Sequence, residues 1–474
     1  MLLKNGKVLI QINEDLKFKD LDIKISGNII SDVGENLDCD ESTKVLDLHG
    51  DFVLPGMINS HYHSYTNILK GTSWGEPLEL WSNDTVALGG ILEGDDHQLS
   101  TLLGAAEMIK MGVTTCIDHI PHLKFAETIG KSYIDSGFKA ALAPMVHNIQ
   151  DREILHGINK YKNSSNPFLS KEEYLDFYES YISKFHNKVN EVTKVVLGIN
   201  SPQRVDDKLL EAVSSLVKKY DLNIHSHFFE TKWQKISADD GFLSPLQRLN
   251  TYDLLNKKTS LAHSIWVDDI DLNLITENDV SVISNPTSNL FLGSGKFPLE
   301  KYMTRNINIA LGSDGLNCGT NHNMLEILRL FLLIQRIDST NYKNWPNPKQ
   351  SYDFITRNAG KILNFKTPVG SIQENYSADI VIVDKSNFIE ILEDSLLNQL
   401  ILNTSTLKPK HVLVNGKFLM KDKKLTTIDE SLLRKEIKKR TPSLKDSMIG
   451  AIEKSSQEKK EFKNVFNSIF NNQN

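Results

Sequence analysis

Cysteine is scarce in this chain of 474 residues, and the three present, Cys39, Cys116 and Cys318, show no paired spacing. Such a set argues against a disulfide framework and against a zinc site built from thiolates. No run reaches the roughly 20 apolar residues that span a bilayer, and the first residues do not form the apolar stretch of a signal peptide. We therefore expect a cytoplasmic protein without a membrane partner.

The chain also lacks an excess of positive charge. Its formal net charge is -6, and acidic and basic residues are interspersed along it. Proteins that bind a phosphate backbone usually carry a stripe of basic residues. The sequence shows no such stripe, so we expect no nucleic acid partner. With 40% hydrophobic and 24% charged residues, the composition is that of a globular protein. At this length, more than one structural unit is expected.

Short strands separated by turn residues occur near both ends of the sequence. Residues 7–12, 21–26 and 29–33 show the pattern early, and residues 378–383 and 411–417 show it again. Two such distant segments can form one small domain. We therefore predict a composite β-sandwich that is built from residues 1–55 and 364–425.

Between these segments, short apolar runs alternate with longer helical stretches, which is typical of βα units around a parallel sheet. We predict an α/β fold in which residues 56–363 form a (β/α)8 TIM barrel, with a doubly wound sheet as the alternative. Polar residues follow nearly every strand, which favours the barrel because its active sites lie at that end. The predicted strands end near His61, His119, Val146, Ser201, His227, His263, Ser284 and Asp314.

Two further segments fall outside the simple alternation. Residues 148–193 are longer than an ordinary βα connection and contain a predicted helix, Lys171–Phe185, so they are interpreted as a lid or a partner surface. Residues 426–474 are rich in Lys, Glu, Ser and Asn. They are predicted to form helices that pack outside the barrel and fray at the end, without a catalytic role.

Two histidines close the first predicted strand. Residues two apart on a strand point to the same face, so His61 and His63 can meet one metal ion. A single His-x-His is weak evidence, since neighbouring histidines are more often incidental. The fifth strand ends with a second pair, His225 and His227. We expect only His227 of this pair to bind metal. His225 would lie deeper in the barrel and donate a hydrogen bond in support of the ligands.

The remaining groups follow the other strands. Glu230 comes just after the fifth strand, His263 closes the sixth, and Asp314 closes the eighth. Each has an ordinary explanation alone, because strand-end histidines and Ser-Asp-Gly turns are common. Together they add a catalytic base and an anionic ligand. Three imidazoles and one carboxylate around an open position suit one divalent ion, with Zn²⁺ preferred and Fe²⁺ as the alternative.

With these residues and the motifs around them, the chain resembles the amidohydrolase superfamily. Within it, the chain resembles the branch of cytosine deaminase-like, guanine deaminase-like and triazine hydrolase-like enzymes. The resemblance extends in order to about residue 420. Its motifs are PGMINSHYH (55–63), ILKG (68–71), PLELW (77–81), MGVTT (111–115), HFFE (227–230), NPTSNL (285–290), GSG (293–295), GSDG (312–315) and ADIV (378–381).

The resemblance implies a site for one metal ion and a set of acid-base residues. Its implied ligands are His61, His63, His227 and Asp314, and its implied catalytic residues are Glu230, His263 and Asp314. No lysine stands at the end of the fourth strand. That absence argues against the branch that resembles dihydropyrimidinase, in which a modified lysine bridges two metals.

One position departs from the family pattern. Many relatives carry a substrate-holding histidine where this chain has Asn200, which offers an amide donor and acceptor instead. The substrate-binding residues that we predict are Asn67, Trp81, Asn200, Gln203 and Arg204. For Arg204, a clamp on a carboxylate or carbonyl and a plain surface position are both open.

These residues predict an aminohydrolase. Metal-activated hydroxide would attack the sp² carbon of a cyclic amidine, Glu230 would carry a proton to the ring nitrogen, and His263 would stabilise the oxyanion before ammonia leaves. The expected partner is a small nitrogen heterocycle: a purine, pterin, pyrimidine, triazine or creatinine-like ring. The alternatives are displacement of chloride or an alkylamine from a ring, and an inactive metal-binding homologue. A homodimer is a further possibility.

Overall fold

Parallel strands form the larger of the two sheets in this computed structural model, which describes residues 1–13, 15–150, 168–238, 244–337, 340–392, 395–403 and 407–471. Neighbours along this sheet follow the order of the chain, without the reversal of a doubly wound sheet. Its strands are β6 (Met57–Tyr62), β7 (Val113–Ile120), β8 (Lys139–Val146), β9 (Thr193–Val195), β10 (Leu197–Ile199), β11 (Ile224–Phe228), β12 (Thr259–His263), β13 (Ser281–Ser284) and β14 (Ile309–Leu311).

The first and last strands of this sheet approach each other and nearly close it into a barrel. The backbone N–H of Asp314, just beyond the end of β14, donates to the carbonyl of His61 in β6 at 3.0 Å. The predicted (β/α)8 class is therefore confirmed. The fourth predicted strand is the exception in detail, since it is split at Val196: β9 pairs with β8, and β10 pairs with β8 and β11.

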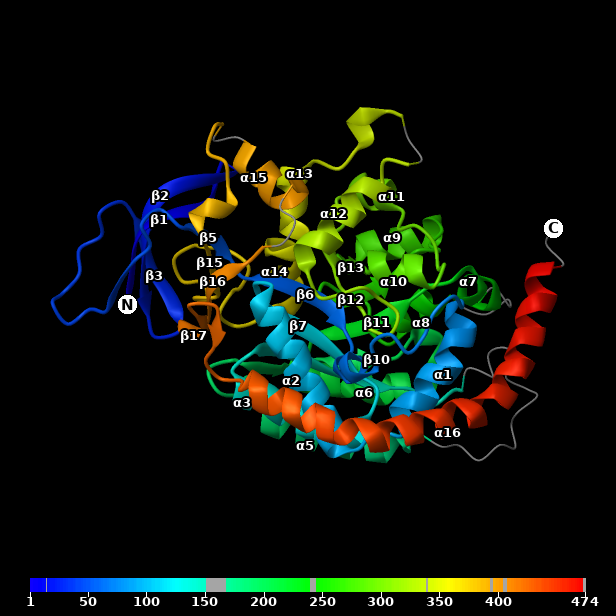
Figure 1. Cartoon of the computed structure of the whole chain (residues 1–474). Helices are drawn as coiled ribbons and strands as arrows, with labels where there is room; N and C mark the ends of the chain where they lie inside the picture. Colours follow the sequence, from blue (N-terminus) through cyan, green and yellow to red (C-terminus); the bar gives the residue numbers. More distant parts are fainter. Residues whose placement is uncertain are drawn as a thin grey trace.

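Helices alternate with the barrel strands and surround them (Figure 1). In α6, Leu209, Val213 and Leu216 recur at helical spacing and are buried, while the side chain of Asp206 caps the first turn. The helices are α1 (Leu78–Gly90), α2 (Gly94–Lys110), α3 (Ala126–Ser136), α5 (Lys171–Phe185), α6 (Asp207–Tyr220), α7 (Lys232–Ala238), α8 (Pro245–Thr251), α9 (Asp269–Glu277), α10 (Pro286–Phe291), α11 (Leu299–Met303), α12 (Met324–Ile334), α13 (Pro348–Ser351) and α14 (Arg357–Leu363).

The long connection between the third and fourth strands contains the predicted helix, which is α5. Residues 151–167 of this connection lie outside the described residues. Within α5, the buried tyrosines Tyr174 and Tyr178 face the barrel, and the hydroxyl of Tyr174 donates to the carbonyl of His147 at 2.7 Å. The connection is therefore tied to the end of β8.

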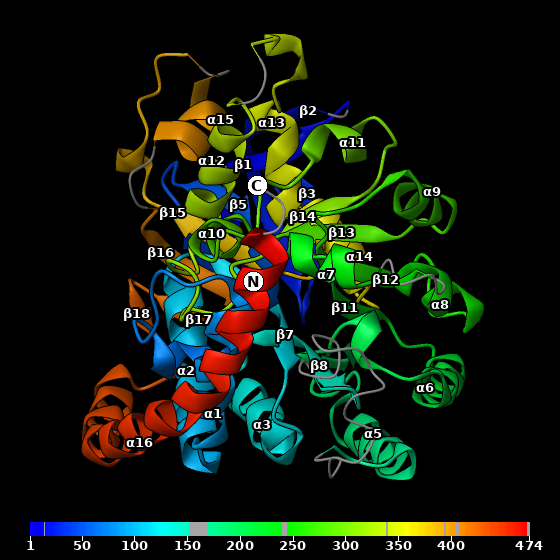
Figure 2. The ribbon, with the colours of Figure 1, turned by 90° about the vertical axis from the view of Figure 1, so that its right-hand side faces the viewer.

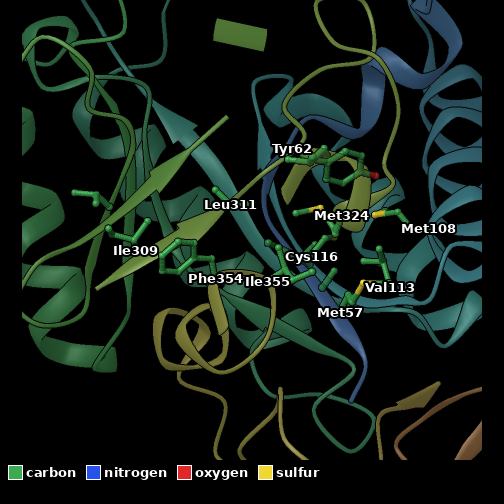
Figure 3. Close-up of a cluster of buried hydrophobic side chains, with 14 of the residues drawn as sticks. Met57, Tyr62, Met108, Val113, Cys116, Ile309, Leu311, Met324, Phe354 and Ile355 are labelled. Atoms are coloured by element: carbon green, nitrogen blue, oxygen red, sulfur yellow. The ribbon is translucent and has the colours of Figure 1, made fainter. Parts of the chain in front are cut away.

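Apolar side chains fill both sides of the barrel wall. Outside it, Met57, Met108 and Met324 belong to one buried cluster between the strands and the helices (Figure 3). Inside it, Ile58 belongs to a second cluster to which α14 contributes Ala359, Ile362 and Leu363. Helix α14 thus fills the amino-terminal end of the barrel with apolar groups, opposite the strand ends that carry the predicted histidines.

Both ends of the chain contribute to a second sheet, which confirms the predicted composite β domain (Figure 1). All of its strands pair in one continuous sheet, in which β15 lies between β5 and β16. The strands are β1 (Leu2–Ile12), β2 (Asp15–Ser26), β3 (Ile29–Gly34), β4 (Val45–Asp47), β5 (Phe52–Pro55), β15 (Ile380–Val383), β16 (Pro409–Val414), β17 (Lys417–Lys421) and β18 (Lys424–Leu425).

Gly56 is the only residue between β5 of this sheet and β6 of the barrel. Its backbone N–H donates to the carbonyl of Asp379 at 2.9 Å. A Cβ atom at this position would lie 2.1 Å from the Oγ1 atom of Thr114, so only glycine allows this close approach. The first barrel strand is thereby attached directly to the composite sheet.

After the short helix α15 (Leu396–Asn398) and the last strands, the chain ends in α16 (Glu430–Asn471). The structure has one long helix here, where several were predicted. Pro442 lies inside it, removes one backbone hydrogen bond and favours a bend. Figure 1 shows the helix curving around the outside of the barrel. Among the described residues, no helix combines the length and the apolar character that crossing a membrane requires.

Candidate active site

The first strand directs two imidazoles into the barrel by means of a bulge. Between Asn59 and Tyr62, β6 advances three residues while its partner β7 advances two. A bulge of this kind re-aims the side chains that follow it. His61 and His63 consequently lie on one side, with their ring centroids 4.9 Å apart, while Tyr62 points to the outer cluster.

Two of the predicted ligands are held through their Nδ1 atoms. The Nδ1–H of His63 donates to the carbonyl of His119 at 2.6 Å, and the Nδ1–H of His227 donates to the carbonyl of Asn200 at 2.6 Å. Since a carbonyl only accepts, these contacts place the proton on Nδ1 and leave the lone pair of Nε2 facing the site. This arrangement is usual for histidines that bind metal.

Further imidazoles lie behind the predicted ligands. The Nδ1 atom of His61 is 2.8 Å from the Nε2 atom of His225, and the Nδ1 atom of His225 is 2.8 Å from the hydroxyl of Ser260. His225 thus lies in the supporting position that we predicted for it. His119 is also fully buried, with its ring 4.6 Å from that of His227, although the sequence had marked it only as a strand end.

The Nε2 atoms of the three predicted histidines and one carboxylate oxygen converge. Nε2 of His63 lies 3.3 Å from Oδ1 of Asp314 and 3.4 Å from Nε2 of His227, and Nε2 of His61 lies 3.6 Å from the same oxygen. Bonds of 2.0–2.2 Å to a tetrahedral ion separate its ligands by about 3.3–3.6 Å. His61 Nε2 has no hydrogen-bond partner among the described residues. These donors therefore fit a divalent metal ion.

Charge and backbone shape adapt Asp314 to this position. Burial favours its neutral form, but the nearby imidazoles of His61, His63 and His263 prevail and hold the pKa of Asp314 well below its usual range. Its backbone φ is 60°, and that of His263 is 70°. Left-handed backbone is uncommon for residues other than glycine and recurs at functional sites. Both predicted strand-end residues thus have strained backbones.

The two predicted acid-base residues lie beside the donors. Nε2 of His263 is 3.6 Å from a carboxylate oxygen of Glu230 and 3.7 Å from one of Asp314, while its Nδ1 is 2.9 Å from Oδ1 of Asn289. Burial raises the pKa of Glu230 to about 7, and the nearby Asp314 adds to this rise while His263 opposes it. A carboxyl group with such a pKa both accepts and releases protons near neutral pH.

One cavity opens over these groups and contains four of the five predicted substrate-binding residues: Trp81, Asn200, Gln203 and Arg204. Two of them interact, because Nη1 of Arg204 donates to Oδ1 of Asn200 at 3.1 Å. This contact ties the amide that departs from the family pattern to a guanidinium. Arg204 is therefore part of the cavity wall.

Asn67, the fifth residue predicted to bind substrate, lies elsewhere in the structure, and its predicted role stays a prediction. It is fully buried outside the cavity lining. Its amide nitrogen donates to the carbonyls of Ser64 and Ser100, and its Oδ1 atom is 2.8 Å from Nε2 of His322. With donor and acceptor both occupied by protein, Asn67 supports the loop after β6.

The cavity also has residues in its wall that sequence reasoning did not assign. Glu79 is a buried carboxylate whose Oε1 accepts a hydrogen bond from Thr231 at 2.5 Å. It lies in the motif that contains Trp81, which was the available signal. Trp233 from α7 and Phe462 from the C-terminal helix also line the cavity. Nothing in the local sequence around Phe462 indicates this position.

Comparison with known proteins agrees with this geometry. The family model described as "Amidohydrolase family" matches residues 52–419. The chain belongs to the amidohydrolase family. A 5'-deoxyadenosine deaminase of Methanosphaera stadtmanae is 29% identical over 87% of this chain and 93% of its own length. A 5-methylthioadenosine/S-adenosylhomocysteine deaminase of Pyrococcus furiosus is 28% identical over 91% and 97%.

Solved structures share the fold. An adenosine deaminase from Xanthomonas campestris with bound zinc aligns with a TM-score of 0.81 at 20% identity, over 94% of this chain and 98% of its own. An atrazine chlorohydrolase from Arthrobacter aurescens complexed with zinc aligns at 0.83 and 20%, over 92% and 99%. With the family and its deaminase relatives, the predicted class is confirmed: a metal-dependent hydrolase acting on carbon–nitrogen bonds in cyclic amidines.

The convergence of the Nε2 atoms generates a test of metal binding. His227→Ala removes one donor, so protein purified without added metal should hold at least tenfold less divalent metal per chain than wild type, by elemental analysis. His147→Ala is the matched control, because His147 follows another barrel strand, β8, without joining the converging donors. Equal metal content in the wild type and in His227→Ala would contradict the assignment.

Proposed function

We propose that this chain binds one divalent ion, zinc in preference to iron, and hydrolyses the exocyclic amino group of a 6-aminopurine nucleoside to release ammonia. The observation that carries the proposal is Glu230. Its carboxyl group, with a pKa of about 7, lies beside His263 in the cavity that also contains the converging donors. Hydrolytic deamination needs a group that accepts and releases protons beside a metal site. A carboxyl group whose pKa is near neutral pH meets that need.

The residues divide the chemistry among them. Ser294 donates a hydrogen bond to Oε1 of Glu230 at 3.2 Å, which orients that carboxyl group, and the other oxygen faces His263. Glu230 is therefore placed to deliver a proton to the ring nitrogen and then to the departing amine. His263, with Nδ1 against Asn289, presents Nε2 to the oxygen that develops charge in the transition state.

The donor set determines what a metal would add. His61, His63, His227 and Asp314 would hold the ion, as three nitrogens and one oxygen suit zinc best and iron next. A divalent ion supplies a water nucleophile that is deprotonated near neutral pH. The lowered pKa of Asp314 keeps this carboxylate ionised, so it is available as an anionic ligand and as an acceptor of a hydrogen bond from water.

Relatives support the choice of substrate. Those quoted above are named as deaminases of 5'-deoxyadenosine and of 5-methylthioadenosine/S-adenosylhomocysteine. The likeness to triazine hydrolases rests on structures 20% identical and shows the fold alone. We therefore propose an adenine-type nucleoside in preference to a triazine.

The cellular setting belongs to the same proposal. A cytoplasmic location agrees with three cysteines that are all free thiols. The homodimer and the absence of a nucleic acid partner stay predictions.

Ammonia release tests the function and the role of Glu230 together. Zinc-loaded wild type should release ammonia from 5'-deoxyadenosine, adenosine and 5'-methylthioadenosine. Glu230→Gln should lose roughly 10²–10⁴-fold in kcat, because the proton carrier is removed, while its metal content stays at the wild-type level. Glu211→Gln, the same change on the exposed face of α6, is the control. A fully active Glu230→Gln, or ammonia from none of the three nucleosides, would reject the proposal.

The contact between Asn200 and Arg204 predicts a specificity effect. Asn200→Ala removes the amide and releases Arg204. The fall in kcat/KM should therefore correspond to about 1–3 kcal/mol of lost transition-state stabilisation, as expected when a hydrogen-bonding group in a half-buried position is lost. Metal content should not change, because the backbone carbonyl that holds His227 remains. An unchanged kcat/KM would show that Asn200 serves only to end its strand.

A further inference from the structure

The C-terminal helix α16 is attached to the helices around the barrel at several positions along its length. Near its start, Lys110 of α2 pairs with Glu430 at 2.6 Å. Two residues before Pro442, Arg440 donates to both carboxylate oxygens of Asp96, at 2.7 and 2.9 Å. A bidentate pair of this kind fixes direction as well as distance. The first half of α16 is thereby held along α2.

A second set of contacts attaches the far half of α16 to α1. The ammonium of Lys459 lies between Oε2 of Glu76, at 2.5 Å, and Oδ2 of Asp84, at 2.6 Å. The hydroxyl of Ser455, which is buried, donates to Oδ1 of the same Asp84 at 2.8 Å. Single surface ion pairs contribute little, but several partners sharing one lysine form a network. The end of α16 is therefore positioned against α1.

Helix α1 lies between α16 and the cavity. Asp84 faces α16, whereas Trp81, Thr85 and Val86 line the cavity. Three residues after Lys459, Phe462 of α16 lines the same cavity. Figure 2 shows the last turns of α16 crossing in front of the barrel. The helix that begins outside the barrel thus ends over its mouth.

Phe462 is half-buried, so it lies nearer to solvent than the buried groups that would react with the ring. Val86 lines the cavity and is yet 68% exposed, so the cavity meets solvent beside it. The reacting groups, in contrast, are buried at the strand ends. A ligand with its ring at those groups can reach α16 only with its far end. The side chains that α1 and α16 offer there include the apolar Trp81, Val86 and Phe462.

We propose that Phe462 is a specificity-determining residue that contacts the apolar group at the 5' end of the nucleoside, with Lys459 positioning it. This inference rests on the proposed function and adds the site that selects the 5' substituent. Phe462 serves as a fixed wall that removes a methyl or methylthio group from water. A polar hydroxymethyl group gains less from the same contact, since only apolar area is stabilised by burial there.

The test compares three substrates with two variants. For Phe462→Ala, kcat/KM with 5'-methylthioadenosine should fall roughly tenfold, as for other single contacts in an apolar pocket, and with 5'-deoxyadenosine somewhat less. With adenosine it should fall less than about twofold, since its 5' group is polar. Lys459→Ala should change the three values in the same order, because it releases the end of the helix. Lys460→Ala, an exposed neighbour, is the matched control.

The outcomes separate two kinds of failure. Equal losses on all three nucleosides in Phe462→Ala, or no loss on any, would overturn the role of Phe462 while wild-type activity upholds the proposed function. No ammonia from the wild type with any of the three would overturn the proposed function itself. Melting temperature and metal content, measured on each variant, show that folding and the metal site are intact. Loss of the preference in Lys460→Ala as well would count against a specific contact.

Discussion

The structure depends on the burial of several neutral imidazoles at one end of a parallel barrel. Burial lowers the pKa of His61 to about 4, and it lowers the pKa of His119, His225 and His227 well below the usual value. These rings are consequently uncharged and have lone pairs to donate. A buried polar nitrogen without a partner costs about 1–3 kcal/mol. A metal ion that occupies the converging donors removes this cost, so metal binding also stabilises the fold.

The rest of the molecule keeps these groups in place. The apolar side chains of α14 fill the amino-terminal end of the barrel, and the reacting groups lie at the other end. Gly56 attaches the first barrel strand to a sheet made from both ends of the chain, and the bulge that follows turns His61 and His63 inward. On the outside, α16 extends around the barrel to the mouth of the cavity. Distant parts of the sequence thus meet around one site.

Much of the fold and of the metal site could be predicted because their signals are local. Buried parallel strands are short apolar runs, and the groups that follow them must meet at one end of a barrel. Asn67 was expected to bind substrate but lies outside the cavity. Its partner His322 is far away along the chain, so no local pattern reveals that the Asn67 amide is occupied. Phe462 was missed for a similar reason. The last turns of its helix are positioned by ion pairs between Lys459 and residues near the start of α1 and within it, which are distant in the sequence.

The central claim, that three histidines and one aspartate converge on a single ion, is tested most directly by X-ray absorption at the metal edge of the loaded protein. The account predicts nitrogen and oxygen ligands at about 2.0–2.2 Å with imidazole scattering, and no second metal nearby. A sulfur ligand at about 2.3 Å, or a metal–metal distance of about 3.5–4 Å, would contradict it.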